Sequence, residues 1–240
     1  MPGAGLKSDA RKLMRENAPK IFIISLIFVA IFALFGELQI RLFGILRMAE
    51  QVAVRLSAGE SLSLGMFNLG TSGAGAMLAI VLGFMASVVD FGFMRYCLRL
   101  SRGQEGSSKD LWDGFALFSK VFLLALLIWV FTFLWALLFF FPAIPAMYRY
   151  RQAYYILMDD PEKTPLQCIR ESKQLMAGNK LDLFLLDLSF IGWSLLNVFI
   201  SMLIPFPFPI VTIWLRPYMG LTMAGYYNQL VRYSPDYGGL

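Results

Sequence analysis

Six ionisable residues interrupt the apolar stretches of this 240-residue chain. A charge at the depth of the bilayer hydrocarbon costs at least about 2.5 kcal/mol, so such residues are retained to pair with one another or to line a polar path. Four arginines against two aspartates leave surplus positive charge, which would attract an anionic solute or a lipid headgroup. The candidate binding residues of this charge cluster are Asp90, Arg95, Arg149, Arg151, Asp187 and Arg216.

Distances along helices predict how these charges pair. At 1.5 Å per helical residue, Arg149 lies roughly 10 Å below the outer membrane surface and Asp90 roughly 13 Å from the inner one. We therefore expect Arg149 to reach Asp90, and by the same arithmetic we expect Asp187 to meet Arg151.

Two interpretations of the cluster stay open. Structural ion pairs would fix how the spans pack, whereas surplus positive charge around a water-filled cavity would bind a solute. Tyr148, Tyr150 and Tyr154 lie beside the arginines and could offer hydroxyl groups to a ligand. Aromatic residues at this density are also common as packing and membrane-interface groups.

Residue types that carry most catalytic and metal chemistry are missing. The chain has no histidine and no phosphate-binding or nucleophile motif, and Cys97 and Cys168 have no metal-site spacing. Asp159, Asp160 and Glu162 form a carboxylate cluster, but they are more simply explained as a helix end. We expect no metal, no cofactor and no enzymatic activity.

The composition predicts the class of protein. Hydrophobic residues make up 58% of the chain, charged residues 15%, and the mean hydropathy is +0.63. A soluble domain has about a quarter of its residues charged, so this chain is expected to lie in a lipid bilayer. Spans need about 20 apolar residues each. We predict an all-α polytopic membrane helix bundle, a single domain over residues 1–240, with spans at about 19–36, 74–98, 120–141, 143–158, 181–204 and 209–231.

Turns and basic residues predict the topology. The segments "FFPAIPA" and "IPFPFPI" contain prolines that favour tight hairpins after the third and fifth spans. With an even number of spans both termini share a side, which collects 14 of the 21 lysines and arginines. The positive-inside rule places both termini in the cytoplasm. Anionic lipid explains the net charge of +5, so nucleic acid is not an expected partner.

Similar junctions predict tandem units. "KLMRENAPKIF" (12–22) and "QLMAGNKLDLF" (174–184) share Leu-Met, an Asn three residues on and a Phe five further, and "SSKDLWDGFALFSKVF" (107–122) holds the same place before the third span. Each unit would be an interfacial amphipathic helix followed by a two-span hairpin, with units at 6–100, 107–160 and 164–233. Chance likeness between hydrophobic hairpins is the alternative.

Two further stretches have amphipathic patterns. Residues 37–56 fit either an interfacial helix or an extension of the first span. A second helix is bounded by a Thr164–Gln167 capping box and by Gly178. Its apolar stripe consists of Leu166, Ile169, Lys173 and Met176. We expect this helix to float at the lipid headgroups, with docking onto a partner as the alternative.

Four segments resemble a known family: "DLWDGF", "YYILMDDPEKTP", "IRESKQLMAGNKLDLFLLDLSFIGW" and "RPYMGLTMAGYYNQL" are similar to the bacterial integral membrane family called domain of unknown function 975. The resemblance runs from about residue 75 to 231 and is strongest at 154–193. It implies a multi-pass protein of the bacterial cytoplasmic membrane and no established activity. The chain departs from the usual pattern at Ala143, Arg149 and Arg216.

Two functions compete. The first is a transporter, channel or export component for an anionic or amphipathic solute, with the arginines as attracting charges and the aspartates as counter-ions. The second is a non-transporting scaffold or a regulatory or protective subunit, which binds a protein partner or further copies of itself through cytoplasmic amphipathic helices. A hydrated cavity would favour the first, and dry ion pairs with a co-purifying protein would favour the second.

Overall fold

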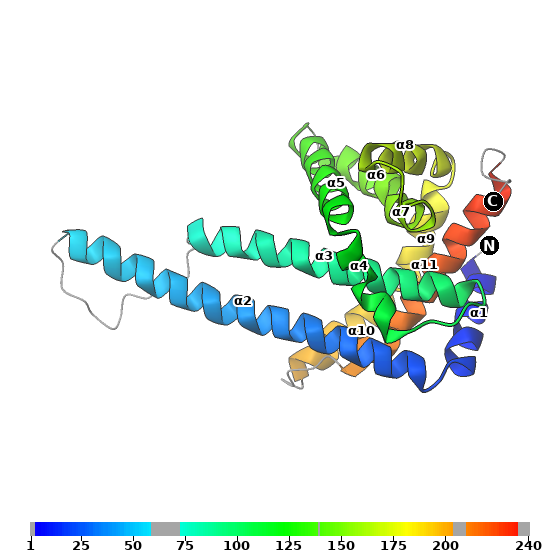
Figure 1. The fold of residues 1–240 in the computed structure, drawn as a ribbon, viewed down its shortest axis with the longest axis horizontal. Coiled ribbons are helices and arrows are strands. Elements are labelled where there is room, and N and C mark those ends of the chain that lie inside the picture. The colour runs from blue at the N-terminus through cyan, green and yellow to red at the C-terminus, as the bar shows by residue number, and fades with distance from the viewer. Residues whose placement is uncertain (1–2, 59–72, 139, 204–209, 235–240) are drawn as a thin grey trace. The chain divides into compact units, whose positions relative to one another are not determined.

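The computed structural model describes residues 3–58, 73–138, 140–203 and 210–234, and every regular element in these ranges is a helix (Figure 1). The all-α prediction is confirmed for this part of the chain. The elements are α1 (Gly3–Glu16), α2 (Lys20–Ala58), α3 (Gly73–Ser101), the 3₁₀ helix η2 (Ser108–Trp112), α4 (Asp113–Ala116), α5 (Phe118–Leu138), α6 (Phe140–Tyr150), α7 (Ala153–Asp159), α8 (Pro165–Leu175), α9 (Lys180–Leu188), α10 (Ile191–Leu203) and α11 (Ile210–Tyr233).

The chain forms two compact units. Unit 1 comprises Met1–Val29 and Ser87–Leu240, and unit 2 comprises Ala30–Ala86. In unit 2, α2 continues without a break through residues 37–56, as expected if this stretch extends the first span. An ion pair of 2.6 Å joins Glu37 and Arg41 on its exposed surface. The single membrane domain and its three repeat units stay predictions.

Four helical segments are long and apolar enough to cross a membrane: Lys20–Leu42, Met77–Ser101, Phe118–Leu137 and Lys180–Ile200. They correspond to four of the six predicted spans. The predicted span at 143–158 is divided, because α6 ends at Tyr150 and α7 begins at Ala153. The predicted span at 209–231 coincides with α11, a 24-residue helix that contains Arg216 and Pro217 and is not among the four.

The predicted turn segment "FFPAIPA" lies within helix α6, whereas most of the second predicted turn falls outside the described residues. Residues 204–209, which hold most of "IPFPFPI", are among those not described, and so is residue 139 between α5 and α6. Helix α6 begins at Phe140, so Pro142 lies in its first turn. Proline is tolerated there because the first backbone N–H groups of a helix have no intrahelical partner.

Helix α1 packs along α11 (Figure 1). Leu6, Ala10 and Met14 are spaced by four residues and are buried. The Lys7 ammonium donates to the Ser189 carbonyl at 3.1 Å and lies 4.1 Å from the centre of the Phe190 ring. The amphipathic N-terminal helix is thus fixed within unit 1.

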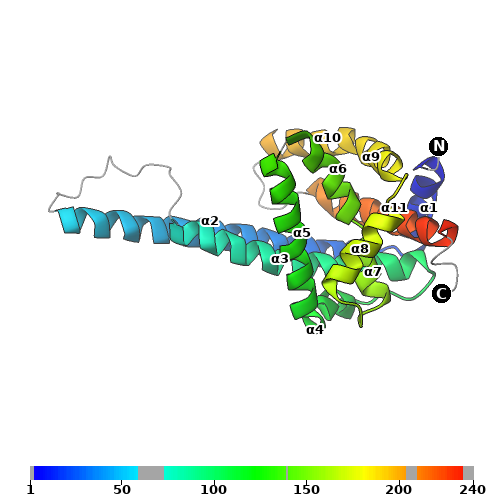
Figure 2. The ribbon, with the colours of Figure 1, turned by 90° about the horizontal axis from the view of Figure 1, so that it is seen from above.

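Helix α8 lies against α5, α6 and α7 (Figure 2). Its buried residues are Pro165, Cys168, Ile169, Ser172 and Leu175. Helix α8 is therefore fixed to its neighbouring helices by one face, and its position at the lipid headgroups stays a prediction. The predicted stripe included Leu166, which is 54% exposed, because the sequence pattern alone did not show that Cys168 and Ser172 would form the packed face.

Burial also determines the chemistry of Cys168. Its side chain is fully buried, and burial raises the pKa of its thiol to about 11. At pH 8 about one thiol in a thousand is then the reactive thiolate. We expect a maleimide to leave Cys168 unmodified in the folded protein at pH 8 and to modify it after unfolding, as measured by mass spectrometry of the peptide. Rapid modification of the folded protein would contradict this burial.

The junctions after α1 and α8 share a local structure. The Asn17 side-chain amide donates to the Leu13 carbonyl at 2.9 Å, and that of Asn179 donates to the Leu175 carbonyl at 3.2 Å. Each asparagine side chain thus adds a hydrogen bond to a carbonyl of the last helical turn, and the Leu13 carbonyl also accepts from the Asn17 backbone N–H at 3.0 Å. The junction before α5 differs, because it contains a Ser107–Asp110 capping box around η2.

The backbone of helix α3 lies in direct contact with the backbones of η2 and α4. A Cβ atom added at Gly92 would lie 2.2 Å from the Leu111 carbonyl oxygen, and one added at Gly114 would lie 2.3 Å from the Val88 carbonyl oxygen. Both distances are far below van der Waals contact, so only glycine permits this packing.

We expect Gly92→Ala to lower the free energy of unfolding by about 1–2 kcal/mol. Overpacking costs about 1–3 kcal/mol, and the better helix propensity of alanine returns part of this. Gly83→Ala is the matched control on the same helix, because a Cβ there meets no described atom within 4 Å. The comparison is made by thermal unfolding in detergent, and equal melting temperatures for the two variants would exclude the tight contact.

Candidate functional site

Unit 1 contains a cavity of about 680 Å³. Side chains from α3, α5, α6, α7, α9 and α11, and from the two residues between α6 and α7, line it. The lining is mostly apolar and aromatic, with two arginines and two aspartates. The size lies within the range of small-molecule sites in proteins, which are also mainly apolar with a few placed polar groups.

Asp90 on α3 forms an ion pair with Arg216 on α11, in which the Nη2 atom donates to Oδ1. The guanidinium also lies over two aromatic rings, with its Cζ atom 5.0 Å from the centre of Phe28 and 5.7 Å from that of Phe93. Ring faces attract cations, so these contacts add to the ion pair. The side chains of Arg216 and Asp90 remain 33% and 35% exposed, which places the pair at the border of open space.

Arg151 and Asp187 form the second ion pair of the cavity. Arg151 lies in the turn between α6 and α7, and Asp187 lies in the last turn of α9. The predicted meeting of these two residues is confirmed.

Two other members of the predicted cluster lie elsewhere. The predicted Arg149–Asp90 pair is wrong, because Asp90 pairs with Arg216 and Arg149 does not line the cavity. Depth along a helix does not determine the direction in which a side chain points. Arg95 also lies outside the cavity and pairs with Asp113 of α4 at 3.3 Å.

The three predicted tyrosines all line the cavity. Each also contacts another ring: Tyr148 contacts Phe184 at 6.0 Å between centres, Tyr150 contacts Phe131 at 6.0 Å, and Tyr154 contacts Phe91 at 6.5 Å. Contacts with phenylalanine rings outside the lining therefore hold the three tyrosine rings in position.

Sequence reasoning missed Gln152. It lines the cavity next to Arg151, only 2% of its surface is exposed, and its Oε1 atom has no hydrogen-bond partner among the described residues. A buried polar atom without a partner is rare in folded proteins and points to a ligand or a water molecule. Its only sequence signal was an amide within a stretch of tyrosines, "RYRQAYY".

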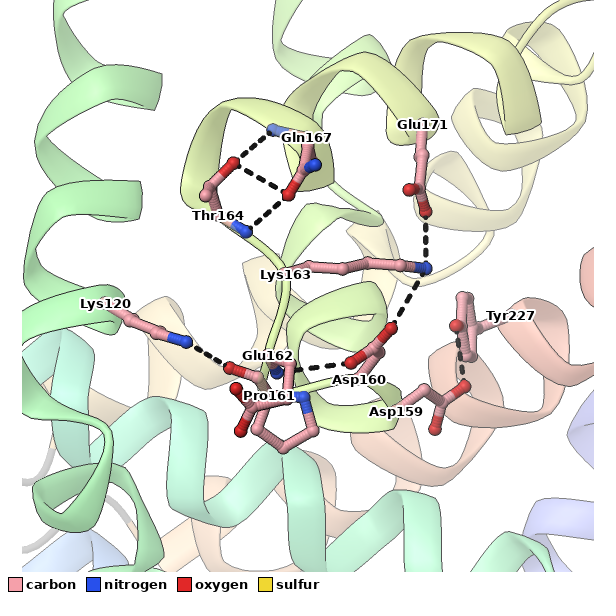
Figure 3. A network of polar contacts seen from close by, with 10 residues as sticks. All are labelled: Lys120, Asp159, Asp160, Pro161, Glu162, Lys163, Thr164, Gln167, Glu171 and Tyr227. Atoms are coloured by element: carbon pink, nitrogen blue, oxygen red, sulfur yellow. Dashed lines mark hydrogen bonds and ion pairs between the residues drawn. The ribbon is translucent and has the colours of Figure 1, made fainter.

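A polar network joins the ends of α3, α7 and α11. Arg102 donates to both oxygens of Asp159, at 2.6 and 2.9 Å, and to Asn228 at 3.0 Å. The Tyr227 hydroxyl donates to Asp159 at 2.8 Å, as Figure 3 shows. Asp159, predicted only as part of a helix end, therefore holds three helices together.

The same network continues into α8. Lys163 contacts Glu171 at 2.9 Å and Asp160 at 3.8 Å, and Lys120 donates to the Pro161 carbonyl at 2.5 Å (Figure 3). Burial lowers the pKa of Lys163, but its hydrogen bond to Glu171 and the nearby carboxylates outweigh this, so the pKa lies above its ordinary value. Lys163 remains charged at physiological pH.

The predicted capping box of α8 is confirmed. The Thr164 hydroxyl accepts from the Gln167 backbone N–H at 3.4 Å, and the Gln167 side-chain oxygen accepts from the Thr164 backbone N–H at 2.8 Å (Figure 3). The first turn of α8 is therefore satisfied locally. Its start is fixed next to the loop that carries Asp160.

No group of histidine, cysteine, aspartate and glutamate side chains in the described part of the chain has the arrangement of a metal site. No curated protein and no solved structure shows a significant match to the chain. The model of a family described as "Protein of unknown function (DUF975)" matches residues 137–234, which include Gln152, both arginines of the cavity, and Asp159 and Tyr227 of the polar network. Over these residues the chain is similar to this family of unknown function, as the resemblance in its sequence indicated.

Proposed function

We propose that this chain is a polytopic membrane transporter, channel or export component, and that its solute binds in the cavity of unit 1. The observation that carries the proposal is the meeting of two ion pairs and several aromatic side chains at one open cavity. Both residues of the Asp90–Arg216 pair line this cavity and remain partly exposed. Of the two predicted solute classes, the balanced charges of the lining favour an amphipathic solute over an anionic one.

The topology that we propose has six spans and both termini in the cytoplasm. In it, α6 and α7 form a broken fourth span and α11 forms the sixth. Non-helical backbone at membrane depth is tolerated where it lines a cavity, and the break at Arg151 and Gln152 does so. Interrupted helices of this kind form the substrate sites of many transporters. The shared Asn17 and Asn179 junctions support the proposed repeat.

Access to the cavity from each side of the membrane tests this function. In a background with Cys97→Ser and Cys168→Ser, a single cysteine is placed in the cavity as Met219→Cys or Thr132→Cys. Leu195→Cys is the control, because Leu195 is 63% exposed and does not line the cavity. Each variant is treated with a membrane-impermeant thiol reagent in intact cells and in inside-out vesicles.

If the protein is a transporter whose cavity opens alternately to the two sides, Met219→Cys and Thr132→Cys should be labelled in intact cells and in inside-out vesicles. A channel should also be labelled in both preparations, because its cavity is open to both sides at the same time. The Leu195→Cys control should not be labelled if it faces lipid. If correctly inserted cavity variants are labelled from neither side, the cavity has no solute path and the proposal fails.

The alternative of a scaffold that docks a partner through amphipathic helices has less support. Helix α1 buries Leu6, Ala10 and Met14 against α11, and α8 buries Ile169 and Leu175 against α5 to α7, whereas Leu166 stays exposed. Most of the apolar residues of these two helices are therefore already covered.

A further inference from the structure

The charges that line the cavity are balanced. Arg151 and Arg216 each contact one aspartate, Asp187 and Asp90 respectively. Arg149, whose charge would make the lining positive, is not part of it. A ligand with a net negative charge would add an uncompensated charge to this balanced lining, which is unfavourable away from water. A ligand of zero net charge leaves both pairs compensated.

The lining has hydrogen-bonding groups that no described residue satisfies. Asp187 Oδ1 and Gln152 Oε1 are acceptors without a donor, and Arg216 Nε is a donor without an acceptor. All three residues line the cavity, so small rotations of their side chains would present these atoms to a ligand. The chemistry that complements them is a donor group together with an acceptor group.

The remaining lining selects the rest of the ligand. Phe93, Trp129, Met219 and Met223 offer apolar surface, and the tyrosines offer ring faces that attract an ammonium group. A polar ligand without an apolar part would leave this surface unused.

We propose that the cavity binds an amphipathic zwitterion with a primary ammonium group. The ammonium N–H groups donate to Asp187 and Gln152, an anionic oxygen accepts from Arg216, and the apolar part packs on Trp129 and Met223. The inference rests on the proposed function only in taking this cavity as the solute site. An ethanolamine phospholipid and a free apolar amino acid share this chemistry.

Binding to the purified full-length protein in detergent, measured by isothermal titration calorimetry, tests the proposal and separates the two sources. The lipid probes are dihexanoyl phosphatidylethanolamine, its trimethylated choline counterpart and dihexanoyl phosphatidic acid. The free probes are L-leucine and N,N,N-trimethylleucine. Trimethylation keeps the positive charge and removes every N–H donor.

We expect at least one primary-ammonium probe to bind about tenfold or more tightly than its trimethylated counterpart, because buried acceptors would otherwise lack a donor. Binding by the ethanolamine lipid identifies a headgroup site, and binding by leucine alone identifies a free solute. Gln152→Leu should remove most of this preference, whereas Gln174→Leu on the exposed surface of α8 should keep it.

Equal affinity for the trimethylated probes, tightest binding of phosphatidic acid, or no binding of any probe would each overturn the proposal. Failure of the zwitterion-binding proposal can be distinguished from failure of the transport proposal. If a zwitterion binds but the cavity cysteines are labelled from neither side, transport is refuted and the binding proposal stands. If the cysteines are labelled from both sides but no zwitterion binds, the binding proposal is refuted and transport stands.

Discussion

Replacing Arg216 by methionine is expected to lower the free energy of unfolding by about 2–4 kcal/mol. The substitution leaves the Asp90 carboxylate unpaired among apolar residues and removes the guanidinium from the Phe28 and Phe93 rings. Breaking a fully buried ion pair costs about 3–5 kcal/mol, and the partial exposure of this pair reduces the value. The measurement is unfolding in detergent, followed by tryptophan fluorescence.

A double-mutant cycle separates the pair from the packing. Asp90→Leu together with Arg216→Met should recover at least half of the loss, because neither charge then lacks a partner. The control is Arg41→Met, which breaks the exposed Glu37–Arg41 pair and should change stability by less than about 1 kcal/mol. If the double variant were as unstable as the sum of the single variants, the two side chains would not be coupled.

The second large effect is expected for Asp159→Ala, at about 2–3 kcal/mol. This carboxylate accepts both hydrogen bonds of the Arg102 fork and that of the Tyr227 hydroxyl, and its side chain is only 17% exposed. Its loss leaves a half-buried guanidinium and a hydroxyl without their acceptor, and charge-assisted bonds of this kind are among the stronger ones.

Asp160→Ala is the matched control, because it is the same substitution at the next residue. Asp160 is 44% exposed and makes one long ion pair, at 3.8 Å to Lys163, and a hydrogen bond of 3.2 Å from the Glu162 backbone. We expect a loss of no more than about 1 kcal/mol. If both variants melted at the same temperature, Asp159 would not hold α3, α7 and α11 together.

The spans that sequence predicted well are those whose signal is local. Lys20–Leu42, Phe118–Leu137 and the other two segments are long apolar runs, and length and hydropathy alone identify them. The stretch at 143–158 is shorter and contains Arg149, Arg151 and Gln152, and its helix is interrupted at the last two of these residues. Arg151 at this break pairs with Asp187, a residue in a different helix that the local pattern does not indicate.

The candidate site could likewise be predicted only where the spacing of residues along the chain was sufficient. Counting residues along the helices paired Arg151 with Asp187 correctly. The same counting paired Asp90 with Arg149 and not with Arg216, because only the packing of α11 against α3 brings Arg216 to Asp90. Gln152 was missed because one amide among tyrosines has no periodicity, and its burial is a tertiary property.

The ion pairs of the cavity join residues that the ribosome makes at different times. Arg151 precedes Asp187 by 36 residues, and Asp90 precedes Arg216 by 126. At about 5–20 residues per second, Asp90 waits on the order of 10 s for its partner. On the proposed topology the bundle is therefore completed by its last helix, and a nascent chain that stops before α11 keeps an uncompensated carboxylate that membrane quality control can recognise.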